Sequence, residues 1–487
     1  MVGRPSRRVR LIVAIVAALA ILAPLVWLWQ SSLVPSSYSV TGMGHLDYGG
    51  GLVGDHDHSS TARSINDIVV DPARKADVRV DLVAEQQNLS IGSRSVPGYT
   101  LNGTSPGPSI TAYRGQLVEV HLRNASVKAG MALHWHGVDV PAAMDGVAGV
   151  TQDEIPVGGE FTYRFVANQV GTYWYHSHQV SNEQVIGGLF GSLVVLPGAG
   201  RGEQVDVVAA AHSYAGTKTL NGAPGDLKVP AKPGDQVRIR VINTDNGPIE
   251  TWADTPFQVL AVDGYAVNGP TDVPDHSMTV TAGGRADLGV TMPSDGKPVR
   301  VQVSKGTAVI LGNGDPPAPA QPPTALDLLS YGTPTTLSFD PARANRRFEY
   351  SIGRRPGFVR GIPGLWWSIN GHLYPGVPMY VVREGDIVIM HIDNHSGQVH
   401  PMHLHGHHAV VLSRNGVTAT GSPWWIDSLN VLDGETYDIA FLANNPGIWL
   451  DHCHHLKHAE QGMVAHLMYE GVSTPYRIGG TANNQPE

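Results

Sequence analysis

Residues 383–394 read REGDIVIMHIDN, and two earlier stretches repeat the pattern: RGQLVEVHLRN at 114–124 and KPGDQVRIRVIN at 232–243. In each stretch a turn is followed by apolar residues at every second position, which predicts a strand with one buried face. An Asn-Gly pair stands 22 to 24 residues before the last asparagine of each stretch. The chain therefore contains three related β-domains, one around each copy.

The composition agrees with an all-β protein. Hydrophobic residues make up 42% of the 487 residues and charged residues only 15%, while 57 glycines and 35 prolines occur throughout. Such a mixture is typical of many short strands joined by turns. The net charge of −9 includes no basic stripe outside the N-terminus, so we expect no nucleic-acid partner. A single cysteine excludes an intrachain disulfide framework.

The N-terminus carries a segment that could cross a membrane. Residues 11–29 are uncharged and long enough for a transmembrane helix, and four arginines precede them, which places the N-terminus on the inner side. The segment lacks a clear cleavage site of small residues, and Trp27 and Trp29 lie where an aromatic belt is expected. We therefore expect a membrane anchor with the body outside the cytoplasm. The alternative is a signal segment that is removed after export.

Breaks in composition set the domain limits. A short Gly/Pro stretch lies at 197–202, and GNGDPPAPAQPPT at 312–324 is expected to be an extended linker. The predicted divisions are an anchor or signal segment at 1–30, a flexible tether at 31–75, a first domain at 76–198, a second domain at 199–311, the Pro-rich linker at 312–324, a third domain at 325–473 and a C-terminal tail at 474–487.

Paired histidines follow the first and third copies of the repeat. The first copy is followed by HWHG at 134–137 and the third by HPMHLHGH at 400–407, whereas the corresponding part of the second copy has no histidine. Later come GTYWYHSH at 171–178 and GIWLDHCH at 447–454, which align with each other position for position. Metal chemistry is therefore predicted in the first and third domains and not in the second.

The spacing of these histidines has a geometric meaning. In an extended backbone the side chains at positions i and i+2 point to the same side, so each pair presents two imidazoles together. In HCH the middle side chain points the other way, so Cys453 can bind one metal while His452 and His454 face another. We interpret Cys453 as a short electron bridge between two metal centres.

The residues around Cys453 indicate which metal is bound. Two histidines, one cysteine and a weak axial methionine form the ligand set of blue-copper electron-transfer sites. The nearby chain supplies Cys453, His458 and Met463, and HPMHLHGH supplies a further histidine, best His400. Zinc is the alternative, but zinc prefers closed tetrahedral sites. A zinc site would not explain the additional pairs of histidines.

With these motifs the sequence resembles the multicopper oxidases, a family of three-domain laccase-like enzymes, from about Ala76 to Glu470. The resemblance implies three consecutive cupredoxin-like Greek-key β-sandwich or barrel domains behind the N-terminal helix. It also implies four coppers per chain: a type 1 copper, a type 2 copper and a type 3 pair that together with type 2 forms a trinuclear cluster. Carried over by motif, the ligands are His400, Cys453, His458 and Met463 for type 1, His134 and His403 for type 2, and His136, His176, His178, His405, His452 and His454 for type 3.

The resemblance also implies the reaction. A reductant gives single electrons to the type 1 copper, and after four of them the cluster reduces dioxygen to water. The expected partners are dioxygen and a small reductant, and the chain is expected to act as a monomer. We expect laccase-like oxidation of phenols or aromatic amines. The alternatives are a metallo-oxidase that acts on cuprous, ferrous or manganous ions in extracytoplasmic copper homeostasis, and a non-enzymatic relative, which would lack copper ligands.

Two carboxylates are candidates for proton transfer to oxygen. Asp145 lies nine residues after His136 and matches an acidic residue that the relatives place near the cluster, although Asp-Gly is also a common turn. Glu460 falls two residues after His458, as in fungal laccases, whereas many bacterial relatives have the acid where this chain has Ala459. A surface or supporting role for Glu460 is the alternative.

Overall fold

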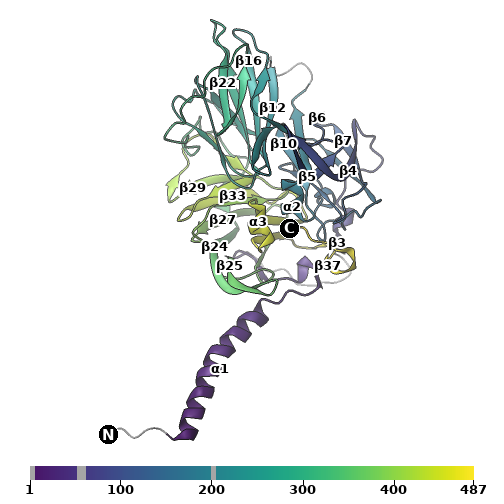
Figure 1. Cartoon of the computed structure of the whole chain (residues 1–487), viewed down its shortest axis with the longest axis vertical. Coiled ribbons are helices and arrows are strands. Elements are labelled where there is room, and N and C mark those ends of the chain that lie inside the picture. Colours follow the sequence, from purple (N-terminus) through teal and green to yellow (C-terminus); the bar gives the residue numbers. More distant parts are fainter. Residues whose placement is uncertain (1–5, 52–61, 199–204) are drawn as a thin grey trace, which may run out of the picture.

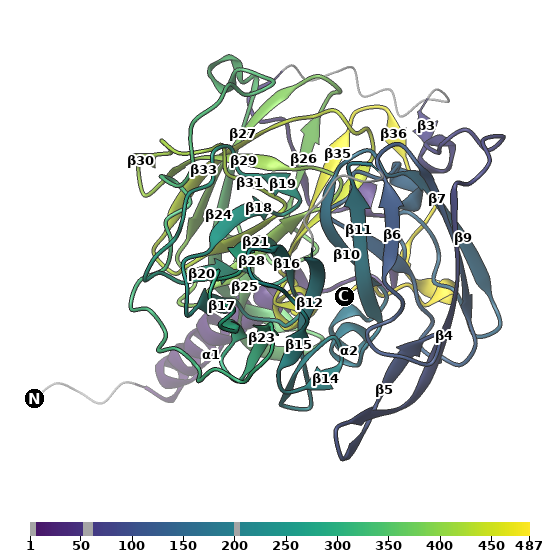
Figure 2. The same ribbon diagram turned by 90° about the horizontal axis from the view of Figure 1, so that it is seen from above.

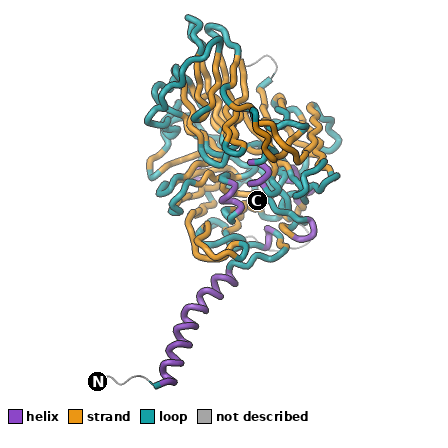
Figure 3. Tube along the Cα trace, viewed as in Figure 1, coloured by secondary structure: helices purple, strands orange, loops and turns teal. Residues whose placement is uncertain are grey.

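The computed structural model describes residues 6–51, 62–198 and 205–487. A single long helix, α1 (Arg7–Ser31), projects from a body made of strands (Figure 1). The other α-helices in the described residues are the short α2 (Ser181–Ile186) and α3 (Leu456–Glu460), and strands dominate the rest (Figure 3). The predicted fold class, all-β behind an N-terminal apolar helix, is confirmed.

The first copy of the repeat lies in a pair of four-stranded sheets. Their strand orders are β5-β4-β7-β9 and β6-β11-β10-β8. The bounds are β4 (Val78–Ile91), β5 (Arg94–Leu101), β6 (Ile110–Tyr113), β7 (Leu117–Asn124), β8 (Leu133–His136), β9 (Glu160–Val166), β10 (Gly171–Ser177) and β11 (Phe190–Leu196). Both sheets contribute to one hydrophobic core, in which Trp135, Tyr163 and Tyr175 are completely buried.

The second copy lies in another pair of sheets, with the orders β14-β13-β12-β16-β21-β18-β19 and β15-β23-β22-β17-β20. The bounds are β12 (Val205–Tyr214), β13 (Thr217–Leu220), β14 (Ala223–Pro224), β15 (Leu227–Val229), β16 (Gln236–Asn243), β17 (Ile249–Ala253), β18 (Gln258–Val262), β19 (Tyr265–Ala266), β20 (Met278–Val280), β21 (Arg285–Thr291), β22 (Val299–Ser304) and β23 (Thr307–Leu311). Leu326, Leu328 and Tyr331 pack on this core, although the predicted third domain begins at residue 325.

The third copy lies in a third pair of sheets, with the orders β25-β24-β27-β33-β29-β30 and β2-β26-β35-β34-β28-β32, and with β31 paired to β29. Figure 2 shows these sheets beside those of the first copy. The bounds are β2 (His45–Asp47), β24 (Arg346–Val359), β25 (Ile362–Ile369), β26 (Pro378–Val382), β27 (Ile387–Asn394), β28 (His400–Leu404), β29 (Ala409–Arg414), β30 (Val417–Thr418), β31 (Trp425–Ile426), β32 (Ser428–Val431), β33 (Thr436–Leu442), β34 (Ile448–Cys453) and β35 (Val464–Tyr469).

Three short parts of the segment predicted as a flexible tether, residues 31–75, are held by backbone pairing. Strand β2 joins a sheet through β26, and short ladders link β1 (Ser37–Tyr38) to β37 (Ile478–Gly479) and β3 (Arg63–Ser64) to β36 (Val472–Ser473). These paired parts are therefore not a free linker, because their N–H and C=O groups bond to other strands. Residues 52–61 of the tether lie outside the described residues.

The asparagine that ends each copy of the repeat has a structural role. Asn124, Asn243 and Asn394 are completely buried. The Nδ2 of Asn243 donates to the carbonyls of three residues in two following segments, and its Oδ1 accepts from the Asp245 N–H. Asn124 and Asn394 make the same kind of contacts, each donating to two carbonyls. The side chain thus supplies partners for buried loop groups that have no strand to pair with.

Replacement of Asn243 tests this role in the domain without predicted metal ligands. Asn243→Ala leaves several buried carbonyls without a donor, so we expect the free energy of unfolding to fall by about 3 kcal/mol. Urea denaturation of the copper-loaded protein measures the change. Asn168→Ala, at an exposed position, is the control and is expected to change it by less than about 0.5 kcal/mol. Equal effects of the two variants would contradict the role.

Candidate metal centre

Four strands bring the paired histidines together. Strand β10 pairs with β8 so that His176 lies opposite His134, and β28 pairs with β34 so that His403 lies opposite His452. The two strand pairs meet, and their imidazoles interleave: the ring of His134 stacks on that of His405 with centroids 3.8 Å apart. Residues more than 220 positions apart in the sequence therefore share one buried cluster.

The donor atoms of this cluster, together with the cysteine, fall into separate groups. Within each group one donor atom per residue lies within 4.8 Å of the others, and every member is buried. The groups that contain predicted copper ligands are His134, His136 and His403; His136, His176 and His454; His178, His405 and His452; His400, Cys453 and His458; and a group in which Asp145 joins His134 and His405.

His134 and His403 have the hydrogen bonding of metal ligands. The Nδ1 of His134 lies 2.9 Å from the carbonyl of Asp145, and the Nδ1 of His403 lies 2.8 Å from that of Asp427. Since a carbonyl can only accept, both Nδ1 atoms carry the proton and both Nε2 atoms are bare. These Nε2 atoms lie 3.4 Å apart. Two lone pairs that face each other without a proton repel, so the pair fits a bound cation.

The same reasoning applies to His178, His405 and His452. The Nδ1 of His178 donates to the carbonyl of Pro486 at 3.0 Å, and the Nδ1 of His405 donates to the carboxylate of Asp145 at 3.0 Å. Their bare Nε2 atoms lie 3.5 and 3.2 Å from the Nε2 of His452. Three imidazole nitrogens thus converge where a metal ion would remove their mutual repulsion.

His136, His176 and His454 form a third group, and it is recognised by buried nitrogens that have no hydrogen-bond partner among the described residues. The Nε2 of His136 lies 3.1 Å from the carboxylate of Asp427, which leaves its Nδ1 to face the group. This Nδ1, the Nε2 of His176 and both nitrogens of His454 have no hydrogen-bond partner among the described residues. Buried polar atoms are normally satisfied, so this group also fits a metal ion.

Burial keeps these imidazoles in the form that binds metals. Loss of solvent, reinforced by neighbouring histidines, lowers the pKa of His136 and His176 well below the ordinary value. Burial also lowers the pKa of His178 and His454 to about 3. These four histidines are therefore neutral near pH 7, as imidazole ligands must be.

The cysteine group lies on the other face of β34. The Sγ of Cys453 is 3.5 Å from the Nδ1 of His400 and 3.7 Å from the Nδ1 of His458. Met463 is completely buried, and its carbonyl accepts a hydrogen bond from the Cys453 N–H at 3.1 Å. Burial raises the pKa of the Cys453 thiol, so a bound cation is needed to hold it as thiolate. Two imidazoles and a thiolate, with the thioether that the spacing of Met463 predicts, suit copper.

Asp145 is buried beside the cluster. It follows a 3₁₀ turn at Ala142–Met144, and its carboxylate lies 3.0 Å from the Nδ1 of His405 and 3.1 Å from the Nδ1 of His134. The residue therefore contacts two of the predicted copper ligands while also forming the turn before Gly146, which has φ +75°. Asp145 therefore has both of the roles expected from the sequence, in the turn and next to the cluster.

Glu460 lies in a different environment. Its carboxylate bonds to Asn182, Arg360 and Lys457 at 2.9, 3.0 and 2.9 Å. Among the described residues it makes no hydrogen bond or ion pair with a predicted copper ligand. These partners support the alternative expectation of a surface or supporting role.

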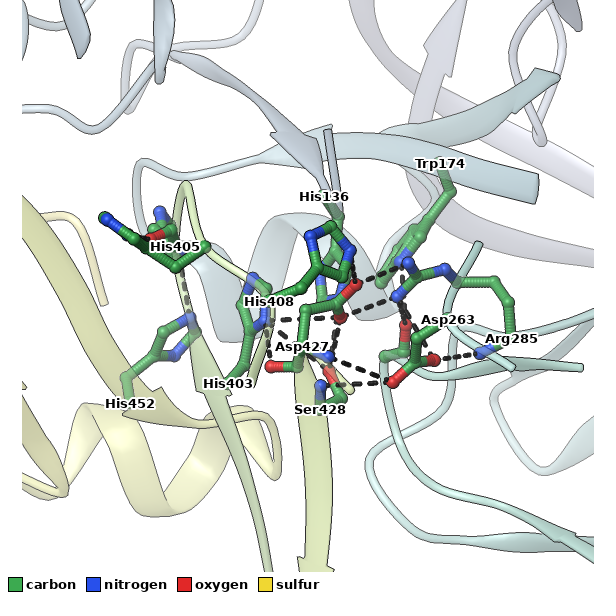
Figure 4. A network of polar contacts seen from close by, with 12 residues as sticks. His136, Trp174, Asp263, Arg285, His403, His405, His408, Asp427, Ser428 and His452 are labelled. Carbon is green, nitrogen blue, oxygen red and sulfur yellow. Dashed lines mark hydrogen bonds and ion pairs between the residues drawn. The ribbon is translucent and has the colours of Figure 1, made fainter. Parts of the chain in front are cut away.

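An acidic residue that the sequence analysis did not single out, Asp427, lies at the centre of a charged network (Figure 4). Its carboxylate makes a two-pronged pair with Arg285, at 2.6 and 2.5 Å, and lies 3.1 Å from the Nε2 of His136 and 3.3 Å from that of His408. Burial alone would raise the pKa of Asp427, but Arg285 and the two histidines hold it well below its usual range. Asp427 therefore stays ionised and orients His136.

The C-terminal tail also reaches the cluster, which no motif indicated. Besides the Pro486 carbonyl that bonds His178, the carboxylate of Glu487 lies 3.2 Å from the Nδ1 of His452 and 2.6 Å from the Ser181 hydroxyl. A backbone carbonyl has no sequence signature, and the tail is separated from His178 and Ser181 by more than 300 residues. Only the folded chain reveals these contacts.

Comparison with known proteins gives consistent results. Residues 83–200 and 333–471, together more than half of the chain, match two family models described as multicopper oxidase. Laccase-1 of Botryotinia fuckeliana is 29% identical over 476 residues, with 82% of this chain and 83% of that protein covered. The multicopper oxidase MmcO of Mycobacterium tuberculosis is 28% identical, with 80% and 87% covered.

A solved structure agrees with these relatives. The multi-copper oxidase from Pseudomonas thermotolerans superimposes with a TM-score of 0.67 at 25% identity, and the match covers 81% of this chain and all of that one.

Removal of the central carboxylate is expected to destabilise the assembly. Asp427→Ala leaves the buried Arg285 with Asp263 as its one remaining anionic partner among the described residues. We therefore expect a loss of about 3 kcal/mol in the free energy of unfolding, measured by urea denaturation. The control is Asp315→Ala, which removes an exposed carboxylate 3.9 Å from Arg300 and is expected to cost less than about 0.5 kcal/mol. A loss below 1 kcal/mol in Asp427→Ala would contradict the role of the network.

Proposed function

Because this chain belongs to the multicopper oxidase family, we propose that it is a laccase-like oxidase that couples the oxidation of phenols or aromatic amines to the reduction of dioxygen to water. The chain is a copper-dependent oxidoreductase with oxygen as acceptor. The observation that carries the proposal is the arrangement of His452, Cys453 and His454, three consecutive residues that belong to three different groups of donor atoms.

We assign the ligands as the motifs suggest. His400, Cys453 and His458 would hold type 1 copper with Met463 as axial ligand, His134 and His403 would hold type 2, and the remaining six histidines would hold the type 3 pair: His136, His176, His178, His405, His452 and His454. When bound, copper supplies one-electron oxidation at the first site and four-electron reduction of dioxygen at the other three. The backbone between Cys453 and its two neighbours is a continuous covalent path between these sites.

The residues around the cluster have supporting roles in this proposal. Asp145 fixes the orientation of His405 and His134 through their Nδ1 atoms, and its carboxylate is placed to hold a proton that oxygen reduction consumes. Asp427 fixes His136 and, through its carbonyl, His403. Glu460, which pairs with Lys457 and Arg360, is assigned to the surface rather than to proton transfer.

The helix α1 supports a location at a membrane. This helix is long and apolar enough to cross a membrane, and none of its residues is buried in the protein. We propose that it anchors the chain in a membrane, with the oxidase body outside the cytoplasm. The orientation rests on the arginines before the apolar run.

Oxygen uptake distinguishes the proposed substrate class from its alternative. The copper-loaded full chain is supplied with a methoxyphenol or with chelated cuprous ion, with and without added cupric ion. Rapid turnover of the phenol without added copper is the expected result. A preference for cuprous ion by orders of magnitude, or phenol oxidation only when free copper acts as a shuttle, would instead identify a metallo-oxidase.

Substitution of the cysteine tests the ligand assignment. In Cys453→Ser we expect the copper content to fall from four to about three per chain and phenol-driven oxygen uptake to fall to background, because the hard hydroxyl does not replace the soft thiolate. Metal analysis and oxygen electrode measurements check both. His276→Ala removes a half-buried histidine whose Nδ1 donates to the carbonyl of Pro274 and which is not one of the proposed copper ligands, so it should retain the full copper content. Retention of four coppers in Cys453→Ser would refute the assignment.

A further inference from the structure

The end of α1 is fixed to the body next to the cysteine group. The Ser32 hydroxyl, which follows the helix, accepts a hydrogen bond from the Phe358 N–H at 3.0 Å, and the guanidinium of Arg355 lies over the ring of Trp27 at 5.3 Å. Both partners belong to β24, which forms a hairpin with β25 (Figure 1). A membrane that contains α1 would therefore face this hairpin.

The hairpin exposes two apolar side chains close to its turn, which is formed by Arg360 and Gly361. Ile362 and Leu365 expose 60% and 57% of their surface. Exposed apolar side chains that continue the surface of a membrane-spanning helix are suited to the boundary between headgroups and acyl chains. The same strand β25 carries Trp367, whose ring lies 4.8 Å from that of His400 and 4.4 Å from that of His458. The hairpin thus joins the membrane side of the body to the cysteine group.

A cavity of about 430 Å³ lies between the helix end, the hairpin and the cysteine group. Its walls include the segment 32–34 after α1, the hairpin residues 358–361, the loop 459–462 and residues 484–487 of the C-terminal tail. This loop joins His458 to Met463, two proposed ligands of type 1 copper. Leu33 and Val34, at the side next to α1, are exposed apolar residues. The cavity is therefore apolar toward the membrane and ends at the loop that carries the electron-accepting site.

The wall contains a buried histidine nitrogen without a hydrogen-bond partner among the described residues. His466 lies in β35, lines the cavity and is 1% exposed, and its Nε2 has no hydrogen-bond partner among the described residues. A buried imidazole nitrogen is costly to leave without a hydrogen bond, and a hydroxyl of a ligand would satisfy it. The cavity thus offers the unpaired His466 nitrogen to a ligand, and its other polar wall residues include Ser32, Arg360, Glu460, Gln461, Asn484, Gln485 and Glu487. The wall next to α1 is apolar.

We propose that this cavity binds a membrane-dissolved hydroquinone, with its ring against the loop 459–462, one hydroxyl toward His466 and an alkyl tail past Leu33 and Val34 into the bilayer. The inference rests on the proposed oxidase function and on membrane anchoring by α1. Two hydroquinones lose four electrons and four protons to become two quinones, and one dioxygen takes up these electrons and protons to become two waters. The substrate reaches the enzyme laterally through the bilayer.

Substrate preference tests the proposal with the full chain, loaded with copper and embedded in phosphatidylcholine nanodiscs. Oxygen uptake is compared for two hydroquinones with the same ring, one with a decyl chain and one with a methyl group. We expect kcat/KM to be at least tenfold higher for the decyl compound. Because the bilayer alone concentrates this compound, the double variant Leu33→Asp and Val34→Asp is needed, and it should lower the ratio of the two kcat/KM values at least fivefold.

Two further variants complete this test. Val417→Asp changes an exposed valine of β30, which lies at the opposite edge of the sheet from β25, and should leave the ratio unchanged. His466→Leu should raise KM for the decyl compound more than it lowers kcat. Turnover of methyl-hydroquinone and methoxyphenol without a preference for the decyl compound would overturn the cavity proposal while leaving the oxidase function intact. If cuprous ion alone is oxidised, the proposed function fails as well.

The position of the hairpin can be measured independently of activity. Cys453 is the chain's single cysteine and is completely buried, so Leu365→Cys and Val417→Cys each provide a selective site for a fluorescent label. In nanodiscs that contain brominated phosphatidylcholine we expect the label at position 365 to lose at least half of its intensity and the label at 417 to be unaffected. Equal intensities at both positions would show that the hairpin does not touch the bilayer, and entry from the membrane would be overturned.

Discussion

The arrangement of the metal centre depends on the buried ion pair between Arg285 and Asp427. Arg285 comes from the sheets of the second repeat and Asp427 from those of the third, and the guanidinium also donates to the carbonyl of Thr172 in the first. Neither charge is stable alone in a dry interior, because the loss of hydration costs several kcal/mol per ion. The pair therefore links the packing of all three repeats to the orientation of His136. The second repeat lacks the paired histidines, yet it supplies the cation on which this orientation depends.

The local part of this architecture could be predicted from the sequence. Alternation along a strand is a property of the backbone itself, so the histidine pairs and the opposite direction of Cys453 follow from spacing alone. The three-fold repeat was visible because buried asparagines such as Asn243 must recur wherever the same loop carbonyls need a donor. These features depend on neighbours in sequence or on a pattern that repeats, and both can be read without knowledge of the packing.

The remaining part depends on contacts between distant segments. Arg285 and Asp427 are 142 residues apart and belong to no motif, so their pairing is decided by how the sheets meet. The carbonyl of Pro486 is chemically the same as any other carbonyl until folding places it against His178. For Glu460 the spacing from His458 was visible, but the short helix α3 directs the carboxylate to Lys457, three residues earlier. Spacing along the chain does not determine which face of a short helix a side chain occupies.

The first repeat shows that the fold alone does not make a cysteine-type metal site. Ser177 aligns with Cys453, and its N–H donates to the carbonyl of Leu189 just as the Cys453 N–H donates to that of Met463. Its hydroxyl donates to Gln184, whose amide in turn donates to the carbonyl of Gly130, so the polar groups at this position are satisfied within the protein. The backbone is equivalent in the two repeats, but the first repeat offers neither thiolate nor thioether here. The metal chemistry therefore lies in side chains placed on a repeated scaffold, and a serine in place of the cysteine turns the same position into part of a hydrogen-bonded core.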